Sequence, residues 1–383
     1  MPGTSTCTSC DAHYPADDNL LRCSACDAPL LHEPDGKRIF PVDEIATRPA
    51  EMWRYREALP PFHAPVRLGE SVTPLVPFQV AEIDVLAKCE YCLPTGSYKD
   101  RGAAVLTSFL AELGVQEAVE DSSGNAGAAL AGYCASAGIA LRVFCPESAS
   151  IEKLTQIRLY GATLERVPGP RAAATEALHE YLQANPGSVY ASHLWHPFFL
   201  EGIRTLAWEI CEQLAWRAPD WVVTPVGAGG ILLGLHYGFR DLLHAGLVEH
   251  VPSLLAVQAS HNASVCDAYV AGLDHVPTPM LSESLPTLAE GIAVPVPVRH
   301  REVMAALRES DGDAVAVSES EITEGILALG RAGLAVEPTS AVIWAGLQQL
   351  YERRPLVEGS TVVTILSGSS LKAGAAITEL LPN

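Results

Sequence analysis

The sequence predicts an α/β protein built on mostly parallel sheets with helices on both faces. From residue 100 onward, short apolar runs alternate with longer stretches in which apolar residues recur every three or four positions. Hydrophobic residues make up 48% of the 383-residue chain, which is enough to bury large cores. Because a strand–helix–strand unit places its helix over the sheet, this alternation favours parallel strands that are buried on both faces.

Taken in order, a strand is predicted wherever a short apolar run is bounded by turn residues. These runs are 85–91, 116–120, 141–145, 163–167, 189–192, 221–225, 254–258, 314–317 and 361–366. A helix is predicted wherever the apolar spacing changes to a helical one. These stretches are 52–60, 100–113, 128–137, 151–160, 171–183, 201–217, a helix from 232, 319–332 and 340–353. Between them, 69–75 is expected to be a loop.

The charge and the termini limit the possible function classes. The formal net charge is −20, whereas binding nucleic acid requires a basic surface. No apolar run reaches the length of a transmembrane helix, and residues 1–19 lack the charged-then-apolar layout of a signal peptide. We therefore expect a soluble, cytoplasmic protein that acts on a small molecule, with no nucleic-acid or membrane partner.

Four of the ten cysteines have the spacing of a metal site. Cys7, Cys10, Cys23 and Cys26 follow the pattern C-x2-C-x12-C-x2-C, which suits tetrahedral thiolate binding of zinc. The alternatives are free thiols or a site that has lost its metal. Disulfides are not expected in a chain without a secretion signal.

The stretch 93–102 centres on Lys99. Residues 95–97, Thr-Gly-Ser, predict a turn, and the helix predicted from residue 100 follows at once. A lysine at such a loop-to-helix junction can react with a carbonyl group if it is held neutral and desolvated. The alternative is an ordinary surface lysine near a helix start.

Three further loops are predicted at the carboxyl ends of strands, where ligands bind in sheets of this type. The glycines of 227–230 would let the backbone approach an anion at a helix N-terminus. The loop 122–125, Ser-Ser-Gly-Asn, could hold a carboxylate, and the hydroxyls of 367–370 could face a ring nitrogen. The alternatives are a tight turn for the first loop and helix caps for the other two.

Together these features suggest one ligand. A Schiff-base lysine, a phosphate cradle and a hydroxyl for a ring nitrogen are what pyridoxal 5′-phosphate requires. The sequence resembles the threonine synthase branch of the fold-type II (tryptophan synthase β-like) pyridoxal-phosphate enzymes. The matching stretches span almost the whole chain and are 94–102, 122–127, 201–205, 225–230, 337–341 and 366–372.

The resemblance implies a role for each site residue. Lys99 would form the Schiff base and later carry the substrate's protons. Tyr98 would pack against the cofactor ring, and Asn125 would bind its phenolic oxygen. Ser367 would meet the ring nitrogen, and a neutral hydroxyl there suits elimination and replacement better than transamination. The phosphate would be bound by the backbone of Gly227, Ala228, Gly229, Gly230 and Ile231. The substrate carboxylate would be held by Ser122, Ser123 and Gly124.

The substrate is where this sequence departs from threonine synthases. That family usually carries Asn-Pro-x-Arg before the Glu-Gly-x-x-Thr helix, and this segment helps to hold the phosphate of O-phosphohomoserine. Here His196 replaces the Asn and Phe199 stands at the Arg position. Losing these donors removes strong, charge-assisted hydrogen bonds to a phosphate. We expect a threonine synthase-like enzyme working at the β or γ carbon of an amino acid that need not be O-phosphohomoserine.

Two other functions stay open at this point. Residues 288–293, Leu-Ala-Glu-Gly-Ile-Ala, look more like the matching segment of serine and threonine dehydratases. A non-catalytic zinc-ribbon binding protein on an inactive enzyme scaffold is a third possibility, which the intact Lys99, Asn125 and Ser367 disfavour. The aromatic residues near Phe199 either suit a less anionic side chain or simply pack. His193 and His196 could act as acid or base, but they are left out of the catalytic set.

The resemblance also implies the architecture. Residues 1–34 would be a zinc-ribbon-like module. Residues 35–105 and 200–383 would form a large pyridoxal-phosphate domain, and 106–199 a smaller α/β domain that closes over the substrate. Homodimers are usual in the family.

Overall fold

The computed structural model describes residues 3–80, 83–149, 151–278, 285–354 and 359–381. The chain divides into two compact units, which we describe one at a time: unit 1 contains Met1–Ser71 and Leu93–Ile203, and unit 2 contains Val72–Cys92 and Arg204–Asn383. The sequence predicted a zinc-ribbon-like module, a cofactor domain and a smaller domain over the substrate. These three domains are defined by function, and their boundaries remain a prediction. None of the described helices is both long and apolar enough to cross a membrane.

Unit 1 begins with a small antiparallel sheet. Its strands β1 (Thr4–Cys7), β2 (His13–Pro15) and β3 (Leu30–Glu33) lie in the order β2-β1-β3. Helix α1 (Val42–Thr47) follows. The helix predicted for 52–60 is wrong: only a 3-10 turn forms, at Met52–Tyr55, because Met52, Trp53 and Tyr55 are all buried instead of presenting one apolar face.

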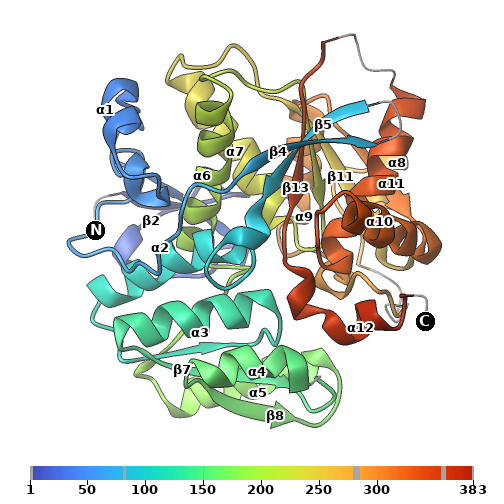
Figure 1. The fold of residues 1–383 in the computed structure, drawn as a ribbon. Coiled ribbons are helices and arrows are strands. Elements are labelled where there is room, and N and C mark those ends of the chain that lie inside the picture. Colours follow the sequence, from blue (N-terminus) through green and yellow to red (C-terminus); the bar gives the residue numbers. More distant parts are fainter. Residues whose placement is uncertain (1–2, 81–82, 150, 279–284, 355–358, 382–383) are drawn as a thin grey trace. The chain divides into compact units, whose positions relative to one another are not determined.

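The second sheet of unit 1 is fully parallel. It contains β6 (Glu117–Glu120), β7 (Ala140–Pro146), β8 (Thr163–Val167) and β9 (Ser188–Tyr190) in the order β8-β7-β6-β9. The helices of this part of unit 1 are α2 (Lys99–Glu112), α3 (Asn125–Ala137), α4 (Ile151–Leu159) and α5 (Arg171–Ala184). Helix α3 packs on both α2 and β7 (Figure 1). Parallel pairing places the carboxyl ends of β6 and β9 at the same edge.

Unit 2 is built on a six-stranded sheet in the order β12-β11-β10-β13-β5-β4. Its strands are β4 (Leu75–Val80), β5 (Ile83–Cys89), β10 (Trp221–Pro225), β11 (Ser253–Ala259), β12 (Asp313–Val317) and β13 (Val362–Leu366). All pairs are parallel except β4 with β5. The segment that contains β4 was not predicted as a strand; its Pro77 is tolerated because β4 lies at the sheet edge.

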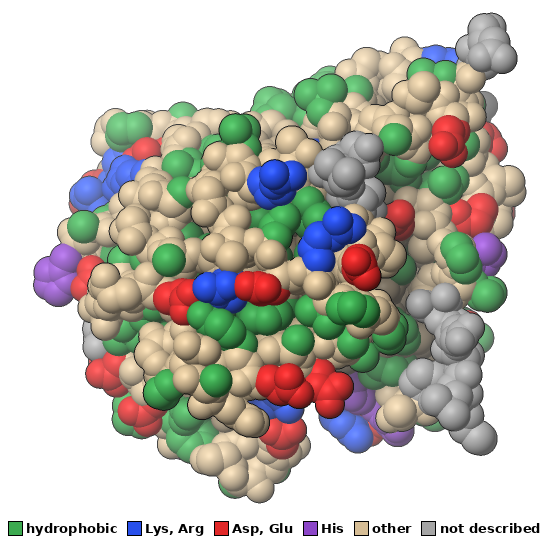
Figure 2. Space-filling model, turned by 90° about the horizontal axis from the view of Figure 1, so that it is seen from below, with side chains coloured by type: hydrophobic (Ala, Val, Ile, Leu, Met, Phe, Trp, Pro, Cys, Tyr) green, Lys and Arg blue, Asp and Glu red, His purple; other side chains and the backbone are tan. Residues whose placement is uncertain are grey.

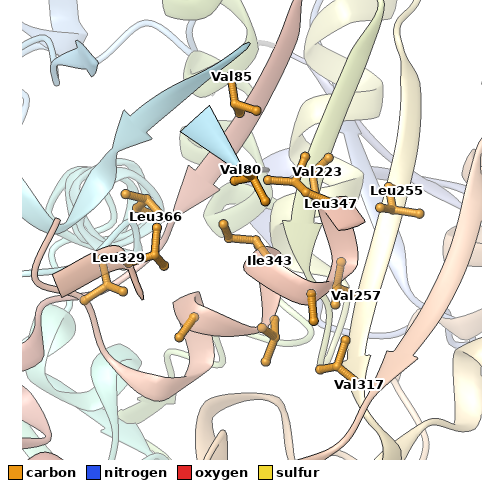
Figure 3. Close-up of a cluster of buried hydrophobic side chains, with 14 of the residues drawn as sticks. Val80, Val85, Val223, Leu255, Val257, Val317, Leu329, Ile343, Leu347 and Leu366 are labelled. Atoms are coloured by element: carbon orange, nitrogen blue, oxygen red, sulfur yellow. The ribbon is translucent and has the colours of Figure 1, made fainter. Parts of the chain in front are cut away.

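The helices of unit 2 cover this sheet. They are α7 (Gly230–His244), α8 (Ser264–Val270), α9 (His300–Glu309), α10 (Glu319–Arg331), α11 (Pro338–Arg353) and α12 (Gly374–Thr378). Figure 3 shows Ile343 and Leu347 of α11 near Val223 and Val257 of the strands, in a cluster of fully buried side chains.

Helix α6 (Pro197–Gln213) connects the units along the chain. It was predicted for 201–217 but begins and ends four residues earlier. A proline is tolerated at the first helical position because its missing N–H would be unpaired there. The helix cannot continue through Ala215 and Trp216, whose φ angles are +56° and +58°. The prediction of two mostly parallel sheets with covering helices is confirmed.

Candidate active site

Lys99 is the first residue of α2, which begins one residue before the predicted start, so the lysine lies at the predicted loop-to-helix junction. The turn before it contains Gly96 at φ +85°, and the Gly96 N–H donates to the Leu93 carbonyl at 2.8 Å. The buried Asp100 carboxylate accepts from the Thr95 N–H at 2.7 Å and from the Thr95 hydroxyl. These hydrogen bonds connect the loop to the first turn of α2 and so fix the backbone position of Lys99.

Two aromatic rings flank the Lys99 ammonium. Its Nζ lies 4.9 Å from the ring centroid of Tyr98 and 5.6 Å from that of Phe199. Lys99 is half-buried, and the neighbouring Ser97 hydroxyl is buried without a hydrogen-bond partner among the described residues. The rings attract a cation but also displace water from it. A lysine that reacts with a carbonyl group needs to be shielded from water, and the two rings provide part of that shielding for the half-buried Lys99.

Phe199 is held at this place by close contact between α2 and α6. A Cβ on Gly102 would lie 2.4 Å from Cε1 of Phe199, and a Cβ on Gly202 would lie 1.9 Å from the Arg101 carbonyl oxygen. Only glycine fits at both positions, so the backbones of the two helices approach closely. Phe199 is 4% exposed. The aromatic residue at the expected arginine position therefore does pack, and it packs beside the lysine.

The loop 122–125 connects β6 to α3. Gly127 is required there, because a Cβ on it would lie 1.9 Å from the Ser122 carbonyl oxygen. Gly124 is the N-cap of α3, and no side chain caps the helix. The alternative that a side chain of this loop caps the helix is therefore wrong. The first backbone N–H groups of the 13-residue helix α3 are available to bind an anion.

A buried pair of titratable side chains, which the sequence did not predict, lies at the same sheet edge. Glu120, the last residue of β6, is fully buried, and its Oε1 lies 2.6 Å from Nδ1 of His193, three residues beyond β9. His193 was considered as an acid or base and left out. The signal that could have found the pair is an acidic residue closing an otherwise apolar strand, because such a residue needs a buried partner.

In unit 2, the glycine loop 227–230 leads from β10 into α7. A Cβ on Gly227 would lie 2.7 Å from Cα of Ile292, and Gly229, at φ +84°, faces Val303 so closely that a Cβ would lie 2.3 Å from Cγ2. The loop has no room for side chains at these positions. The groups available to bind a ligand are therefore its backbone N–H groups and those at the start of the 15-residue helix α7. This arrangement fits a phosphate.

Ser367 follows β13, the parallel neighbour of β10, so the two loops lie at one edge of the sheet. Ser367 is 1% exposed, and its Oγ lies 2.9 Å from Oγ of Ser340 and 3.4 Å from Oε1 of Glu337. The Gly368 N–H donates to Oγ of Ser340 at 3.0 Å. The capping alternative holds only for Ser369, whose hydroxyl accepts from the N–H of Leu371.

The four N-terminal cysteines gather into one cluster. The sulfur atoms of Cys7, Cys10, Cys23 and Cys26 all lie within 4.8 Å of one another. Four thiolates at about 2.3 Å from a central zinc ion would be spaced in this range. The cluster could hold zinc, as its spacing predicted.

Comparison with known proteins shows the family to which the chain belongs. The sequence profile of the family "Pyridoxal-phosphate dependent enzyme" matches residues 66–368. The chain belongs to this family, and it is fold-type II within it. Each unit contributes residues that fit the cofactor: unit 2 has the glycine loop 227–230, and unit 1 has the half-buried Lys99 amine beside two aromatic rings.

The relatives of this chain show which branch of the family it resembles. Threonine synthase from Methanosarcina acetivorans is 32% identical, over 96% of this chain and 91% of that protein. Threonine synthase from Methanocaldococcus jannaschii is also 32% identical, over 96% and 92%. The chain is thus a threonine synthase-like lyase that depends on pyridoxal phosphate and acts on an amino acid.

Solved structures show the same fold. A threonine deaminase from T.th. is 25% identical, with a TM-score of 0.66, over 78% of this chain and 92% of that one. Serine racemase from Dictyostelium discoideum is 25% identical, with a TM-score of 0.65 and the same coverage. The contacts that individual residues make with cofactor and substrate remain the predicted ones.

Proposed function

We propose that this chain uses Lys99 to hold pyridoxal 5′-phosphate and catalyses elimination or replacement at the β or γ carbon of an amino acid. When bound, the cofactor stabilises negative charge at the substrate's α carbon. The observation that carries the proposal is the Lys99 ammonium between the rings of Tyr98 and Phe199, at 4.9 and 5.6 Å. At this place its Nζ would take up and return the α proton.

The remaining roles follow from the chemistry of each group. Backbone N–H groups from Gly227 to Ile231 would bind the phosphate, and Ser122, Ser123 and Gly124 the substrate carboxylate. Tyr98 would pack on the cofactor ring, and Asn125 would donate to its phenolic oxygen. Ser367 would donate to the ring nitrogen while accepting from Ser340, which accepts from the Gly368 N–H. In this order Ser367 would donate to the ring nitrogen in place of Oε1 of Glu337, to which its hydroxyl donates at 3.4 Å in the structure.

The substrate is proposed to lack the phosphate of O-phosphohomoserine. Phe199 is 4% exposed and fills the gap above Gly102, so it leaves an apolar wall where the related synthases carry an arginine. A phosphate dianion against this wall would lose charge-assisted hydrogen bonds. This supports a less anionic amino acid.

A dehydratase that acts on serine or threonine is the second candidate. The residues that resemble dehydratases form the 3-10 turn Glu290–Ile292, which packs on the glycine loop at Gly227. We also propose a cytoplasmic homodimer with structural zinc at the four cysteines. The formal net charge of −20 supports the absence of a nucleic-acid partner, and the face drawn in Figure 2 carries interspersed acidic and basic side chains.

Two measurements test the proposal. Purified protein supplied with the cofactor should absorb at about 410–430 nm, and borohydride should attach the cofactor to Lys99, as located by peptide mass spectrometry. Lys99→Ala should lose both signals, and Lys37→Ala, which changes an exposed lysine, should keep them. Wild-type protein that stays colourless and unlabelled would contradict the proposal.

Substrates then separate the candidates. The enzyme is incubated with O-phosphohomoserine, threonine and serine. Threonine and phosphate from the first would support the synthase and overturn the proposed change of substrate. A keto acid and ammonia from the others would support the dehydratase.

A further inference from the structure

The pair formed by His193 and Glu120 has no role in the chemistry described so far. Both residues follow neighbouring parallel strands of unit 1, β9 and β6, and so lie at the edge where the loop 122–125 begins. The N–H of Ala191 donates to the Val119 carbonyl at 2.9 Å, which extends this pairing toward His193. The backbone pairing of the two strands therefore sets the positions of Glu120 and His193 relative to each other.

The contact within the pair is close and shielded. Oε1 of Glu120 lies 2.6 Å from Nδ1 of His193, and the two side chains are 0% and 7% exposed. The other carboxylate oxygen, Oε2, is buried and has no hydrogen-bond partner among the described residues. Because one ring nitrogen of His193 is occupied by Glu120, only Nε2 can serve another group.

The surroundings favour a pair without net charge. Burial, and then the charge of Asp121, raise the pKa of Glu120 well above its ordinary value, against the opposing charges of Arg171 and Lys99. Burial, and then the charges of Lys99 and Arg171, lower the pKa of His193 well below its ordinary value. Asp121 itself is engaged by the hydroxyls of Tyr190 and Thr175, at 2.9 and 2.6 Å. Both shifts disfavour the ion pair, and the 2.6 Å contact between the two buried side chains fits a carboxyl group that shares its proton with Nδ1 of a neutral imidazole.

Phe199 connects this pair to the reactive lysine. Its ring centroid lies 6.0 Å from that of His193, with the rings at 67°, and 5.6 Å from Nζ of Lys99. The His193 imidazole and the Lys99 ammonium are thus both close to the Phe199 ring. A substrate whose α carbon is at Lys99 would extend its side chain along this ring.

We propose that His193, held by Glu120, is the general acid–base for the side-chain substituent of the substrate, and that this substituent is an uncharged hydroxyl on the β or γ carbon. This inference rests on the proposed function of Lys99. A neutral donor beside an aromatic wall suits a hydroxyl group, whereas a phosphate would require cationic donors. His193 would contact the substrate, and Glu120 would be a positioning residue.

The proton transfers balance in an elimination at the β carbon; for a γ substituent, Lys99 would in addition move a β proton before the carbon–oxygen bond breaks. Lys99 takes the α proton. The carbon–oxygen bond breaks with its electron pair moving to oxygen, and Nε2 of His193 gives that oxygen a proton, so that water leaves. The proton on Glu120 moves to Nδ1, which keeps the imidazole neutral and leaves a carboxylate. In a replacement, the incoming nucleophile gives its proton to Nε2, the proton on Nδ1 returns to Glu120, and Lys99 returns the α proton to carbon. In an elimination, Lys99 releases its proton to solvent and Glu120 takes one up, which restores both groups.

The test compares two leaving groups at one carbon. Holoenzyme is assayed with L-serine, whose hydroxide must be protonated, and with β-chloro-L-alanine, whose chloride need not be. His193→Asn and Glu120→Gln should lower kcat for serine by about 100-fold or more, the range of general acid–base catalysis, while kcat for the chloro compound stays within about threefold. L-threonine and L-homoserine extend the comparison if serine is a poor substrate.

His236→Asn is the matched control, since His236 is another buried histidine paired with a glutamate, at 3.2 Å from Glu309. It should leave both kcat values unchanged. The absorbance of the bound cofactor and the melting temperature report whether each variant is folded and loaded; if one variant fails to fold, the other decides. Equal losses on both substrates, no loss on either, or wild-type turnover of O-phosphohomoserine but of no hydroxyl amino acid would overturn the proposal. Failure of the proposed function is distinct, since wild-type protein would then carry no cofactor at Lys99.

Discussion

The ring of Phe199 fills the space that a Cβ on Gly102 would occupy, with Cε1 only 2.4 Å from that position. The Phe199 side chain is thus placed by the absence of a side chain on a neighbouring helix. Because Nζ of Lys99 lies 5.6 Å from the same ring, the glycine also controls which group lies beside the Lys99 amine. Backbone packing and site geometry depend on each other here.

Gly102→Ala should therefore affect both stability and activity. The added methyl group must move the Phe199 ring or separate α2 from α6, and overpacking of this kind costs about 1–3 kcal/mol. Urea unfolding should show this loss, and kcat should fall because the wall beside Lys99 shifts. Gly330→Ala is the control, since nothing lies within 4 Å of its Cβ position. Equal stability of both variants would contradict the close contact.

The buried ion pair of Lys88 and Glu209 gives a second prediction. Both side chains are 0% exposed, and the Lys88 ammonium also donates to the Thr73 carbonyl at 2.8 Å and to Gln213 Oε1 at 2.7 Å. Removing one partner leaves a buried charge, so Glu209→Gln should destabilise the fold by about 3–5 kcal/mol. The double change Lys88→Met with Glu209→Leu should recover a large part of this loss in urea unfolding. A double variant as unstable as the single one would contradict the argument.

His236 predicts a dependence of stability on pH. Burial, and then the charge of Arg240, lower its pKa from 6.5 to about 4, although Glu309 opposes the shift. The folded state therefore binds this proton less readily than the unfolded state. Stability linked to this group is complete above about pH 6.5 and falls as the pH drops toward 4, by about 2 kcal/mol at pH 5.

The measurement is the free energy of unfolding of wild type and His236→Gln between pH 7.5 and 5. The difference between the two proteins isolates this histidine from the other titrating groups. The wild type should lose stability relative to the variant as the pH falls. Parallel curves would show that the imidazole is not protected from protonation.

The sequence was sufficient for the elements with strong local signals. Strands 163–167 and 221–225 and the junction at Lys99 are found as predicted, because apolar runs and a glycine turn mark them. The pair of Glu120 and His193 was not found, since its members are 73 positions apart and only the pairing of β6 with β9 joins them. Strand β4 was missed because Pro77 argues against a strand unless its edge position is known.

The N-terminal module contacts the start of α6 through side chains from between its cysteine pairs. Oδ1 of Asn19 lies 2.9 Å from Nε2 of His196, and the Arg22 guanidinium lies 3.8 Å from the ring centroid of Trp195. Asn19 adopts φ +52°, a conformation that asparagine tolerates. The loop carrying both contacts runs between Cys10 and Cys23, so its shape depends on what the four cysteines hold.

Removal of metal should therefore be visible at Trp195. If the cluster holds zinc, Cys10→Ser should lower the zinc content and change the tryptophan fluorescence, because the Arg22 cation no longer lies over the ring. The KM for the amino acid should rise with little change in the absorbance of the bound cofactor, since α6 carries Phe199 two residues after the proline that begins it. Cys92→Ser, an exposed cysteine outside the cluster, is the control and should alter neither zinc content nor fluorescence. A Cys10→Ser protein that loses zinc while keeping its fluorescence and KM would show that the module is structurally independent of α6.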